Sequence, residues 1–375
     1  MIQVNLVSIW MVLLLFEIVL FSSYTVIMYI FSKKKERPVE IGHLPDITMI
    51  IPMYNEEKII KEKIENTSQL DYPADKLNII LLDDHSTDNS KNISLKTIKE
   101  KSLNAQVIES RGGKGKARAL NWLFPSLESE LTVITDADAL LKEDSLLQIS
   151  KNYTYPDIGG VTGKIVIISD RSRPSKSQED SYRFYFDIWR RGESKIFSVS
   201  VCNGPLMSFR TCLLKTMKID PDAYADDSDL LFKTIRSGYR VVYEPNAIVF
   251  ERVPQTMKGR LVQKMKRING LRKVYLRNLG LLGKGYFGLI IYPFALLTHM
   301  VSPLVILVMV LLYPLIILQN IFYLYIMALL VIPGVRKMLL SFIITQFVMN
   351  FSFLIPTSGS WEAIEDARYS LENKH

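Results

Sequence analysis

The stretch Leu131-Thr-Val-Ile-Thr-Asp-Ala-Asp138 decides the fold of this 375-residue chain. Residues 131–135 are apolar or β-branched, which is typical of a short strand buried on both faces. Asp136 and Asp138 follow at once, and ligands of open α/β sheets gather beyond the carboxyl ends of the strands. Two carboxylates at such a place suit a hard divalent cation, one binding it directly and the other through a water or a sugar hydroxyl. The alternative is an acidic loop that caps a helix starting near Lys142.

The segments around this strand alternate between short apolar runs and helical patterns. We expect strands at 47–52, 77–82, 106–108 and 131–135, and helices at 55–70, from Asp88 to Ile98, and at 116–123. Asn55 is placed to cap the first of these helices. Alternation of this kind predicts an α/β fold with a mostly parallel sheet and helices on both faces.

Two polar features lie beside the expected strand ends. Asp83-Asp84 forms either a turn that caps the next helix or an acceptor for a nucleobase N–H. The run Arg111-Gly-Gly-Lys-Gly-Lys-Ala-Arg118 has glycines where backbone turns tightly near a ligand, and its cations suit phosphate. Its alternative is a solvated basic turn, and its spacing is not that of a Walker sequence.

A third acidic cluster, Asp226-Asp227-Ser-Asp229, precedes a helical pattern. Asp229 falls in the first turn of that helix, where a carboxylate interacts favourably with the helix dipole. The close like charges of Asp226 and Asp227 raise the pKa of a carboxylate toward that of a useful general base. The chain has only four histidines, and no serine, histidine and acid arrangement stands out.

The N-terminal segment predicts a membrane anchor over residues 1–32. Residues 6–31 contain a single charge, Glu17, and are long enough to cross a hydrocarbon core of about 30 Å. A basic region ahead of the apolar stretch and a small-residue cleavage site are both missing, so we expect an anchor rather than a removable signal peptide. The basic run at 33–37 places the following domain in the cytoplasm by the positive-inside rule.

The C-terminal part predicts further membrane segments. Residues 45–255 read as the cytoplasmic domain, 256–284 as interfacial amphipathic helices, 285–356 as a region of about three spans, and 357–375 as a tail. Two spans with a tight outer turn fit ahead of Arg336-Lys337, giving four crossings in the whole chain. The alternative for residues 286–320 is an interfacial helix and one span. Either arrangement makes this a multi-pass protein of the cell membrane.

The charge balance points to lipids and nucleotides rather than nucleic acid. The net charge is +8, and the cations crowd after the first anchor, in the 111–118 loop and at 258–284. Anionic headgroups and a nucleotide diphosphate explain these places better than nucleic acid does. Cys202 and Cys212 lack metal-type spacing and are expected to be reduced and structural.

Taken in order, the motifs resemble the family-2 inverting glycosyltransferases of GT-A fold. The resemblance is strongest to their membrane-bound, synthase-like members, those related to cellulose, hyaluronan and chitin synthases. It runs from about Thr48 to Gly270 and includes Ile51-Pro-Met-Tyr-Asn-Glu-Glu57 and the 113–121 segment. The resemblance implies a Rossmann-like GT-A domain with flanking transmembrane helices.

This resemblance implies a role for each matched residue. It places the nucleotide at Pro52, Tyr54, Glu56, Asp84, Lys114, Lys116 and Asp136, and Mg²⁺ or Mn²⁺ at Asp138 with Asp136. The acceptor or diphosphate side falls to Asn203, Gly204, Gln263, Lys266 and Arg267. Asp227 inherits the role of catalytic base, and Asp226, assigned to the catalytic site with it, stands where the family has glutamate. Lys266 and Arg267 replace an arginine and a tryptophan of the synthase-like members, which puts processive synthesis in doubt.

The expected reaction moves a sugar from a nucleotide-diphosphate sugar to a hydroxyl of a glycan or lipid-linked acceptor. A transferase acting on a polyprenyl phosphate is the nearest alternative, but that acceptor is already ionised and needs no base. A catalytically silent membrane scaffold would be expected to lose Asp138 or Asp227, and both are present. A transporter fits poorly, because four spans are few and the large domain has no phosphate-binding loop of the Walker type. The sequence leaves the donor sugar, the acceptor and the oligomeric state open.

Glu17 lies in the middle of the first expected span, where an ionised carboxylate is costly. One interpretation packs it against a polar residue of another span, such as His299 or Gln319. The other places it on the route of a lipid or sugar acceptor.

Overall fold

The computed structural model describes residues 5–35, 43–168, 176–221, 225–252, 256–319, 321–325 and 333–354. These residues form two compact units. The α/β unit contains Lys35–Ser169 and Phe197–Gln263, and the helical unit contains Met1–Lys34, Asp170–Ile196 and Lys264–Thr357. The expected tail at 357–375 lies outside the described residues.

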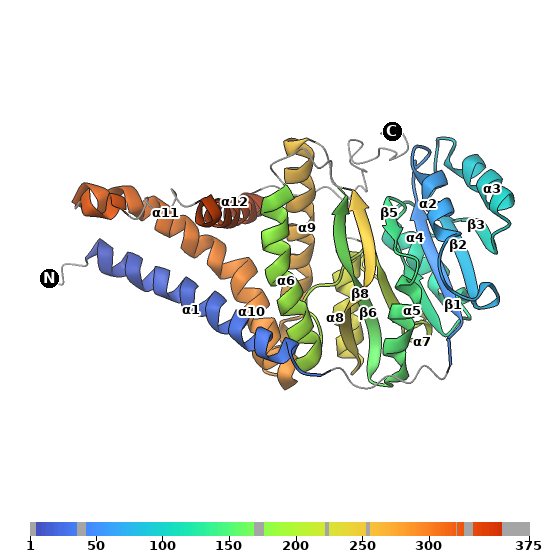
Figure 1. Ribbon diagram of the computed structural model, residues 1–375, viewed down its shortest axis with the longest axis horizontal. Helices are drawn as coiled ribbons and strands as arrows, with labels where there is room; N and C mark the ends of the chain where they lie inside the picture. Colours follow the sequence, from blue (N-terminus) through green and yellow to red (C-terminus); the bar gives the residue numbers. More distant parts are fainter. Residues whose placement is uncertain are drawn as a thin grey trace. The chain divides into compact units, whose positions relative to one another are not determined.

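The α/β unit is built on one eight-stranded sheet with the order β3-β2-β1-β4-β7-β6-β8-β5 (Figure 1). The strands are β1 (Ile47–Met53), β2 (Leu77–Asp83), β3 (Ala105–Glu109), β4 (Leu131–Ile134), β5 (Ala139–Leu141), β6 (Ile158–Ile168), β7 (Met207–Arg210) and β8 (Arg240–Arg252). Strands β3, β2, β1 and β4 are parallel to one another, whereas β7 is antiparallel to β4 and β6. The α/β class and the parallel half of the sheet are therefore confirmed, and the other half is mixed.

The helices of this unit connect the strands in the expected alternation. They are α2 (Ile60–Thr67), α3 (Ser90–Lys101), α4 (Lys116–Leu123), α5 (Ser145–Ser150), α7 (Thr211–Leu214) and α8 (Asp226–Arg236). All seven residues of β1 are buried, as the apolar run of a central parallel strand requires. Apolar residues of β1, β2 and β4 pack with Ile60 and Ile64 of α2 in the main hydrophobic core. This core fixes the strand ends that carry the acidic residues.

One local expectation is wrong, and one alternative does not hold. Asn55 does not cap a helix: it has φ of 53°, its side chain accepts a hydrogen bond from Thr87 N at 2.8 Å, and α2 begins only at Ile60. Asp136 and Asp138 do not form the cap of a helix near Lys142 either. They are followed by the short strand β5, and the next helix, α5, starts at Ser145 after Asp144.

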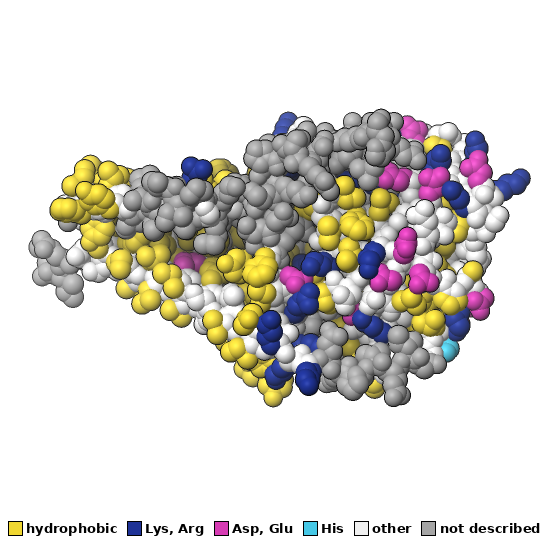
Figure 2. Space-filling model, viewed as in Figure 1, with side chains coloured by type: hydrophobic (Ala, Val, Ile, Leu, Met, Phe, Trp, Pro, Cys, Tyr) yellow, Lys and Arg dark blue, Asp and Glu magenta, His cyan; other side chains and the backbone are white. Residues whose placement is uncertain are grey.

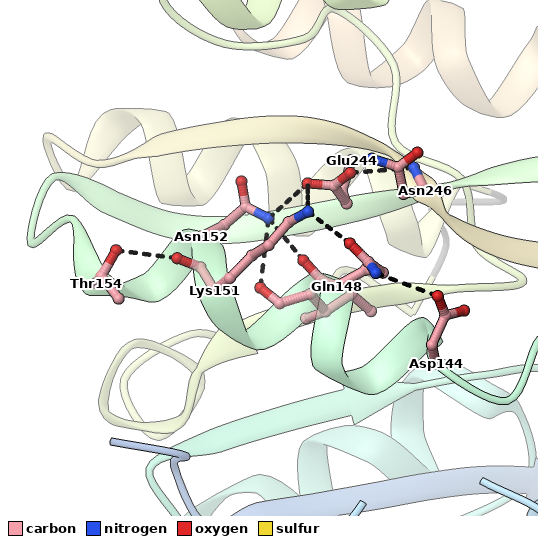
Figure 3. A network of polar contacts seen from close by, with 8 residues as sticks. Asp144, Gln148, Lys151, Asn152, Thr154, Glu244 and Asn246 are labelled. Carbon is pink, nitrogen blue, oxygen red and sulfur yellow. Dashed lines mark hydrogen bonds and ion pairs between the residues drawn. The ribbon is translucent and has the colours of Figure 1, made fainter. Parts of the chain in front are cut away.

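A polar cluster formed by α5, the turn after it and β8 belongs to the framework of this unit (Figure 3). The buried carboxylate of Glu244 accepts hydrogen bonds from Asn152 Nδ2 at 3.0 Å and Asn246 N at 3.0 Å, and Lys151 Nζ lies 3.6 Å away. These contacts fasten the end of α5 to β8. We therefore assign Glu244 a structural role.

The helical unit contains α1 (Leu6–Ser32), α6 (Lys176–Ile196), most of α9 (Met257–Arg277), a continuous helix over Phe287–Gln319 that ends in α11 (Ser302–Gln319), and α12 (Pro333–Leu354). Two of these are long and apolar enough to cross a membrane, α1 with 27 residues and Phe287–Gln319 with 33. Within α12 the apolar stretch Leu339–Phe353 is shorter. Figure 2 shows hydrophobic side chains along the surfaces of α1 and α11. Val12 of α1 and Leu311 of α11 are each 65% exposed.

The structure bears on two parts of the expected arrangement. Ahead of Arg336-Lys337, where two spans are expected, the described residues contain one helix long enough to span, Phe287–Gln319, which runs through Pro314 and contains π-helical turns. Residue 320 and residues 326–332 lie outside the described ones, so the number of spans stays a prediction. Proline is tolerated in apolar helices because local π adjustments satisfy the freed backbone groups again. The second part is α6, which lies within the expected 45–255 domain by sequence but belongs to the helical unit.

Helix α6 joins the helical unit through close contact with α1. A side chain at Gly192 would collide with the backbone of Met28, so only glycine permits this approach. Tyr24 donates a hydrogen bond to Glu193 at 2.6 Å, and Trp189 donates one to Thr25 at 3.0 Å. These contacts are long-range in sequence, which explains why the periodicity of residues 176–196 alone did not predict them.

Candidate active site

The acidic pair after β2 ties two loops of the α/β unit together. Asp83 and Asp84 are 2% and 3% exposed. Asp83 Oδ1 accepts a hydrogen bond from Ser86 N at 3.2 Å, which holds the turn, and Asp84 Oδ2 accepts one from Gly115 N at 2.7 Å. Burial raises the pKa of the Asp84 carboxyl, and the bond from Gly115 partly offsets this. The pair therefore orders the turn and the basic loop at the end of β2.

The basic loop turns on two glycines in the left-handed region, Gly113 with φ of 85° and Gly115 with φ of 116°. Side chains at these positions would strain the backbone. Lys114 between them is exposed, and its carbonyl accepts a hydrogen bond from Arg118 Nη1 at 3.1 Å. The loop thus presents one cation to the outside and directs the next one, Lys116, inward.

Lys116 is the centre of the site. It begins α4, its side chain is 10% exposed, and its Nζ lies 2.7 Å from Asp136 Oδ1 and 3.1 Å from Asp226 Oδ2. Burial disfavours the charged amine, but the two carboxylates outweigh burial and raise its pKa. The structure therefore brings Lys116, Asp136 and Asp226 together, although they come from three distant parts of the sequence.

Asp227 lies beside this cluster in the first turn of α8 and is held by backbone groups. Its Oδ2 accepts a hydrogen bond from Gly204 N at 3.0 Å, and its Oδ1 accepts one from Ser228 N at 2.6 Å. Asn203 fixes the turn that carries Gly204, because its Nδ2 donates to Gly163 O at 2.6 Å and its N donates to Thr162 Oγ1 at 2.8 Å. The predicted residues Asn203, Gly204 and Asp227 are thus in one place.

Asp229, the third carboxylate of that cluster, has structural contacts. Its Oδ2 accepts hydrogen bonds from Asp220 N at 3.0 Å and from Lys233 Nζ at 2.5 Å, one helical turn further on. It lies in the first turn of α8, as expected, where the helix dipole favours it. These contacts account for Asp229 without a role in chemistry.

Two buried cations that the sequence analysis missed contact residues 135–139, which are the acidic segment 136–138 and its two neighbours. Lys63 of α2 is fully buried and donates to Thr135 Oγ1 at 2.8 Å and to Ala139 O at 2.5 Å. Burial lowers the pKa of Lys63 to about 7, against the opposing pull of Asp136 and Asp138. Arg252, at the end of β8, is 1% exposed and donates to Asp138 O at 3.0 Å.

A signal for one of these residues is present in the sequence. Ile60, Lys63, Ile64 and Thr67 recur at helical spacing and are the buried residues of α2. A lysine is almost never fully buried unless it has partners, so a lysine on an apolar helix face indicates a special contact. Arg252 lies at the end of a long strand and offers no comparable pattern.

The remaining predicted nucleotide residues lie around the end of β1. Pro52 is a buried residue of this strand, and Tyr54 follows it half-buried. Glu56 is 5% exposed, and its backbone N donates to Ser90 Oγ of α3 at 2.7 Å. They occupy the carboxyl edge of the sheet next to Asp84, whose backbone N donates to Met53 O at 2.9 Å.

The predicted acceptor residues on α9 lie in two units. Gln263 ends the α/β unit, whereas Lys266 and Arg267 belong to the helical unit. All three are half-buried or exposed residues of one helix. Their placement at the acceptor or diphosphate side stays a prediction.

The donor set fits a divalent cation of the expected kind. No group of three or more histidine, cysteine or carboxylate side chains is placed to hold a metal within the described ranges. Mg²⁺ commonly binds through one or two carboxylates and takes its other ligands from water and substrate phosphate. Asp138 and Asp136 at a strand end meet that requirement, with one oxygen of Asp136 also contacting Lys116.

The sequence matches two family models. Residues 131–335, more than half of the chain, match the glycosyl transferase family group 2 model, and residues 48–210 match that of glycosyl transferase family 2. Poly-beta-1,6-N-acetyl-D-glucosamine synthase of Staphylococcus aureus is 27% identical over 250 residues, covering 66% of this chain and 60% of that protein. The Staphylococcus epidermidis synthase is 26% identical over 234 residues, 62% of this chain and 56% of the synthase. The chain thus spans less than two thirds of these relatives.

A solved structure has the same fold over nearly the whole chain. The mannosyltransferase PcManGT from Pyrobaculum calidifontis, in complex with GDP-Man and Mn²⁺, superposes with a TM-score of 0.79 and 24% identity. The superposition covers 93% of this chain and 98% of the mannosyltransferase. The GT-A fold expected from the motifs is confirmed. The chain belongs to glycosyl transferase family 2 and is a glycosyltransferase.

Proposed function

We propose that this protein is a membrane-bound inverting glycosyltransferase. It moves a sugar from a nucleotide-diphosphate sugar, expected to be a UDP-sugar, to a hydroxyl of a glycan or lipid-linked acceptor. The contact of Lys116 with both Asp136 and Asp226 carries this proposal, because it joins the segment expected to hold the donor to the helix that carries the base. Donor and acceptor chemistry then meet at one point of the α/β unit.

The donor side is assigned to the carboxyl edge of β1, β2 and β4. Pro52, Tyr54, Glu56 and Asp84 receive the nucleoside, and Lys114 is exposed and available to the diphosphate. Mg²⁺ or Mn²⁺ held by Asp138 and Asp136 would neutralise charge on the leaving diphosphate. Lys116 adds a positive charge within reach of the same region. Stabilisation of the leaving group is the largest contribution expected here.

Asp227 is the base in this proposal, and Asp226 is not. Asp226 forms an ion pair with Lys116, so its carboxylate already has a cationic partner. Asp227 is oriented by two backbone N–H groups, and its carboxylate is the group that takes the proton in this proposal. The acceptor hydroxyl gives its proton to Asp227, its oxygen attacks the anomeric carbon, and the bond to the diphosphate oxygen breaks. Attack from the opposite face inverts that carbon, and base catalysis contributes about 10²- to 10⁴-fold.

Membrane attachment rests on the helical unit. Two helices are long and apolar enough to span a bilayer, and their outer surfaces are apolar. The basic residues after α1 favour a cytoplasmic catalytic unit. We assign helix α9, which carries Gln263, Lys266 and Arg267, to the membrane surface, and these three residues to the acceptor side.

The relatives narrow the substrates to test. The staphylococcal synthases are named for a polymer of N-acetylglucosamine, and the mannosyltransferase was solved with GDP-Man. Transfer to a polyprenyl phosphate is the second candidate. It ranks below the first because that reaction needs no base and would leave Asp227 without a role.

The experiment uses the full chain in membranes with radiolabelled UDP-N-acetylglucosamine, UDP-glucose and GDP-mannose, followed by separation of lipid and polymer products. Wild-type transfer that requires Asp227 supports the hydroxyl acceptor. Transfer to lipid that persists in Asp227→Asn supports the polyprenyl phosphate acceptor. Absence of transfer from every donor, with correct insertion, contradicts the proposal.

A further inference from the structure

Lys63 contacts the acidic segment on both of its sides. Its Nζ donates to Thr135, directly before Asp136, and to Ala139, directly after Asp138. Thr135 in turn donates to Pro205 O at 2.8 Å, so the segment is also fastened to the turn beside Gly204. One buried amine therefore fixes both ends of a three-residue turn.

Packing alone does not explain a lysine at this position. The neighbours of Lys63 on the same face of α2, Ile60 and Ile64, are apolar, and both acceptors of its amine are neutral oxygens. Taking an ammonium group out of water is costly, and hydrogen bonds to neutral oxygens offset only part of that cost. A methionine would fill similar space without that cost. The retained amine indicates a task in holding the turn.

Arg252 holds the same turn from β8. Its Nη1 donates to Asp138 O at 3.0 Å, and its Nη2 lies 2.6 Å from Glu62 Oε1. Glu62 is adjacent to Lys63 on α2, so α2 takes part in both contacts. The pairing of β5 with β8 starts only at Ala139, opposite Glu251. The ladder therefore holds the chain after the turn, whereas Lys63 and Arg252 hold the turn itself.

We infer that Lys63 and Arg252 are positioning residues that fix the direction of the Asp136 and Asp138 carboxylates from the buried side. This inference rests on the proposed function, in which those carboxylates hold the cation. Groups that orient metal ligands from behind commonly change metal affinity or activity by about 10- to 100-fold when removed. Arg252 acts through the backbone of the turn and Lys63 through the two residues that flank it, so neither needs to touch the substrate.

The test measures Mn²⁺ binding to the purified full chain in detergent, with UDP or GDP present, by the electron paramagnetic resonance signal of free Mn²⁺. Lys63→Met removes both hydrogen bonds and keeps the aliphatic volume. Lys61→Met is the matched control, because Lys61 is an exposed lysine of the same helix. We expect the Mn²⁺ Kd to rise about 10-fold or more in Lys63→Met and to stay at the wild-type value in Lys61→Met.

Hydrogen exchange of the metal-free protein gives a second readout. Amides of residues 136–141 should exchange several times faster in Lys63→Met and at the wild-type rate in Lys61→Met. If Lys63→Met does not fold, Thr135→Val replaces it, because valine keeps the shape and removes the hydroxyl, which accepts the Lys63 hydrogen bond and donates to Pro205 O. We expect the same changes in that variant, with smaller size.

The outcomes separate this inference from the proposed function. Wild-type protein that binds no Mn²⁺ with either nucleotide contradicts the proposed metal site, and hydrogen exchange then decides the positioning role alone. Wild-type Mn²⁺ binding and exchange in a folded Lys63→Met or Thr135→Val variant overturn the inference. Tighter Mn²⁺ binding in Lys63→Met overturns it too, since Lys63 would then act only through charge.

Discussion

The two units of this protein bury charge in different ways. In the α/β unit, the cations Lys116 and Arg252 are paired with carboxylates, of Asp136, Asp226 and Glu62. In the helical unit, Arg272 is 4% exposed and donates to His299 O, Met349 O and Ser352 Oγ, which are neutral oxygens. The partners of these three cations thus differ in kind, and Lys63, whose amine donates to neutral oxygens, is the exception within the α/β unit.

This difference indicates how each unit uses its buried charged groups. The charges of the α/β unit converge on the ends of β4 and α8, where the proposal places donor and base. Those of the helical unit connect helices: Arg272 joins α9 to the helices that contain His299 and Met349, and Glu17 joins α1 to α11. Buried side-chain atoms without a hydrogen-bond partner occur in the described part of both units, among them Glu17 Oε1 and Arg272 Nη2 in the helical unit and Glu62 Oε2 and Arg252 Nε in the α/β unit. We therefore expect substitutions in the α/β unit to change activity first, and those in the helical unit to change stability first.

Asp138→Ala should have the largest effect on activity. It removes a carboxylate proposed to hold the cation, and electrostatic stabilisation lost at a leaving diphosphate costs several kcal/mol, on the order of 10³-fold in rate. Asp138 is half-buried and lies outside the apolar core, so thermal unfolding should change little. Transfer assays in Mg²⁺ and in Mn²⁺, beside a melting curve, check both parts. A variant that keeps most of its activity would show that the cation is held elsewhere.

Asp227→Asn should come next, with transfer reduced about 10²-fold or more, because an amide cannot take the proton of the acceptor. Asparagine keeps an oxygen that can accept the Gly204 hydrogen bond, so the turn should persist. Calorimetry with the nucleoside diphosphate should give the wild-type affinity. If Asp227→Asn instead loses nucleotide binding, Asp227 is needed to bind the donor. The proposal that donor binding and proton removal are carried out by different residues would then be wrong.

Lys63 should make the stability of the metal-free protein depend on pH. Its pKa is about 7 in the folded chain and about 10.4 when unfolded, so between these values the unfolded state binds a proton that the folded state lacks. The free energy of unfolding therefore rises with pH from about 7 to about 10, by at most roughly 1.4 kcal/mol per pH unit. Below pH 7 Lys63 is charged in both states, and the folded protein carries the full cost of burying that charge.

The melting temperature measured at steps of pH checks this, as the difference between wild type and Lys63→Met. The melting temperature of the wild type should increase relative to that of Lys63→Met as the pH rises, while that of Lys61→Met should follow the wild type. A difference that stays constant from pH 7 to 10 would show that Lys63 remains charged in the folded protein.

The sequence predicted those parts of the fold that local pattern controls. The strands β1, β2 and β4 were placed to within a residue, because each is a short apolar run closed by proline or aspartate. Both ends of helix α4 agree with the prediction, because Gly115 precedes the helix and an apolar face follows. Burial of a central parallel strand leaves little freedom, so the sequence pattern and the structure agree there.

The sequence did not predict features that depend on partners far along the chain. Lys63 meets Thr135 and Ala139 across more than 70 residues, and only the tertiary fold brings them together. The joining of α6 to α1 through Gly192 is of the same kind. The site residues themselves were named from motif order, and the structure adds that Lys116 links two of them.

Glu17→Gln should have the smallest effect. Glu17 is 5% exposed, and its Oε2 accepts a hydrogen bond from Ser302 at 2.8 Å, so a polar residue of another helix is its partner, although neither His299 nor Gln319 is. Glutamine has the same shape and can accept the same bond. We therefore expect wild-type transfer and a melting temperature within a few degrees of wild type, with Ser302→Ala as the matched variant that removes the donor. Both variants should behave alike if the contact only joins α1 to α11. Transfer lost in a stable, correctly inserted Glu17→Gln, with Ser302→Ala still active, would place the carboxylate on the path of the acceptor and end the contrast between the two units.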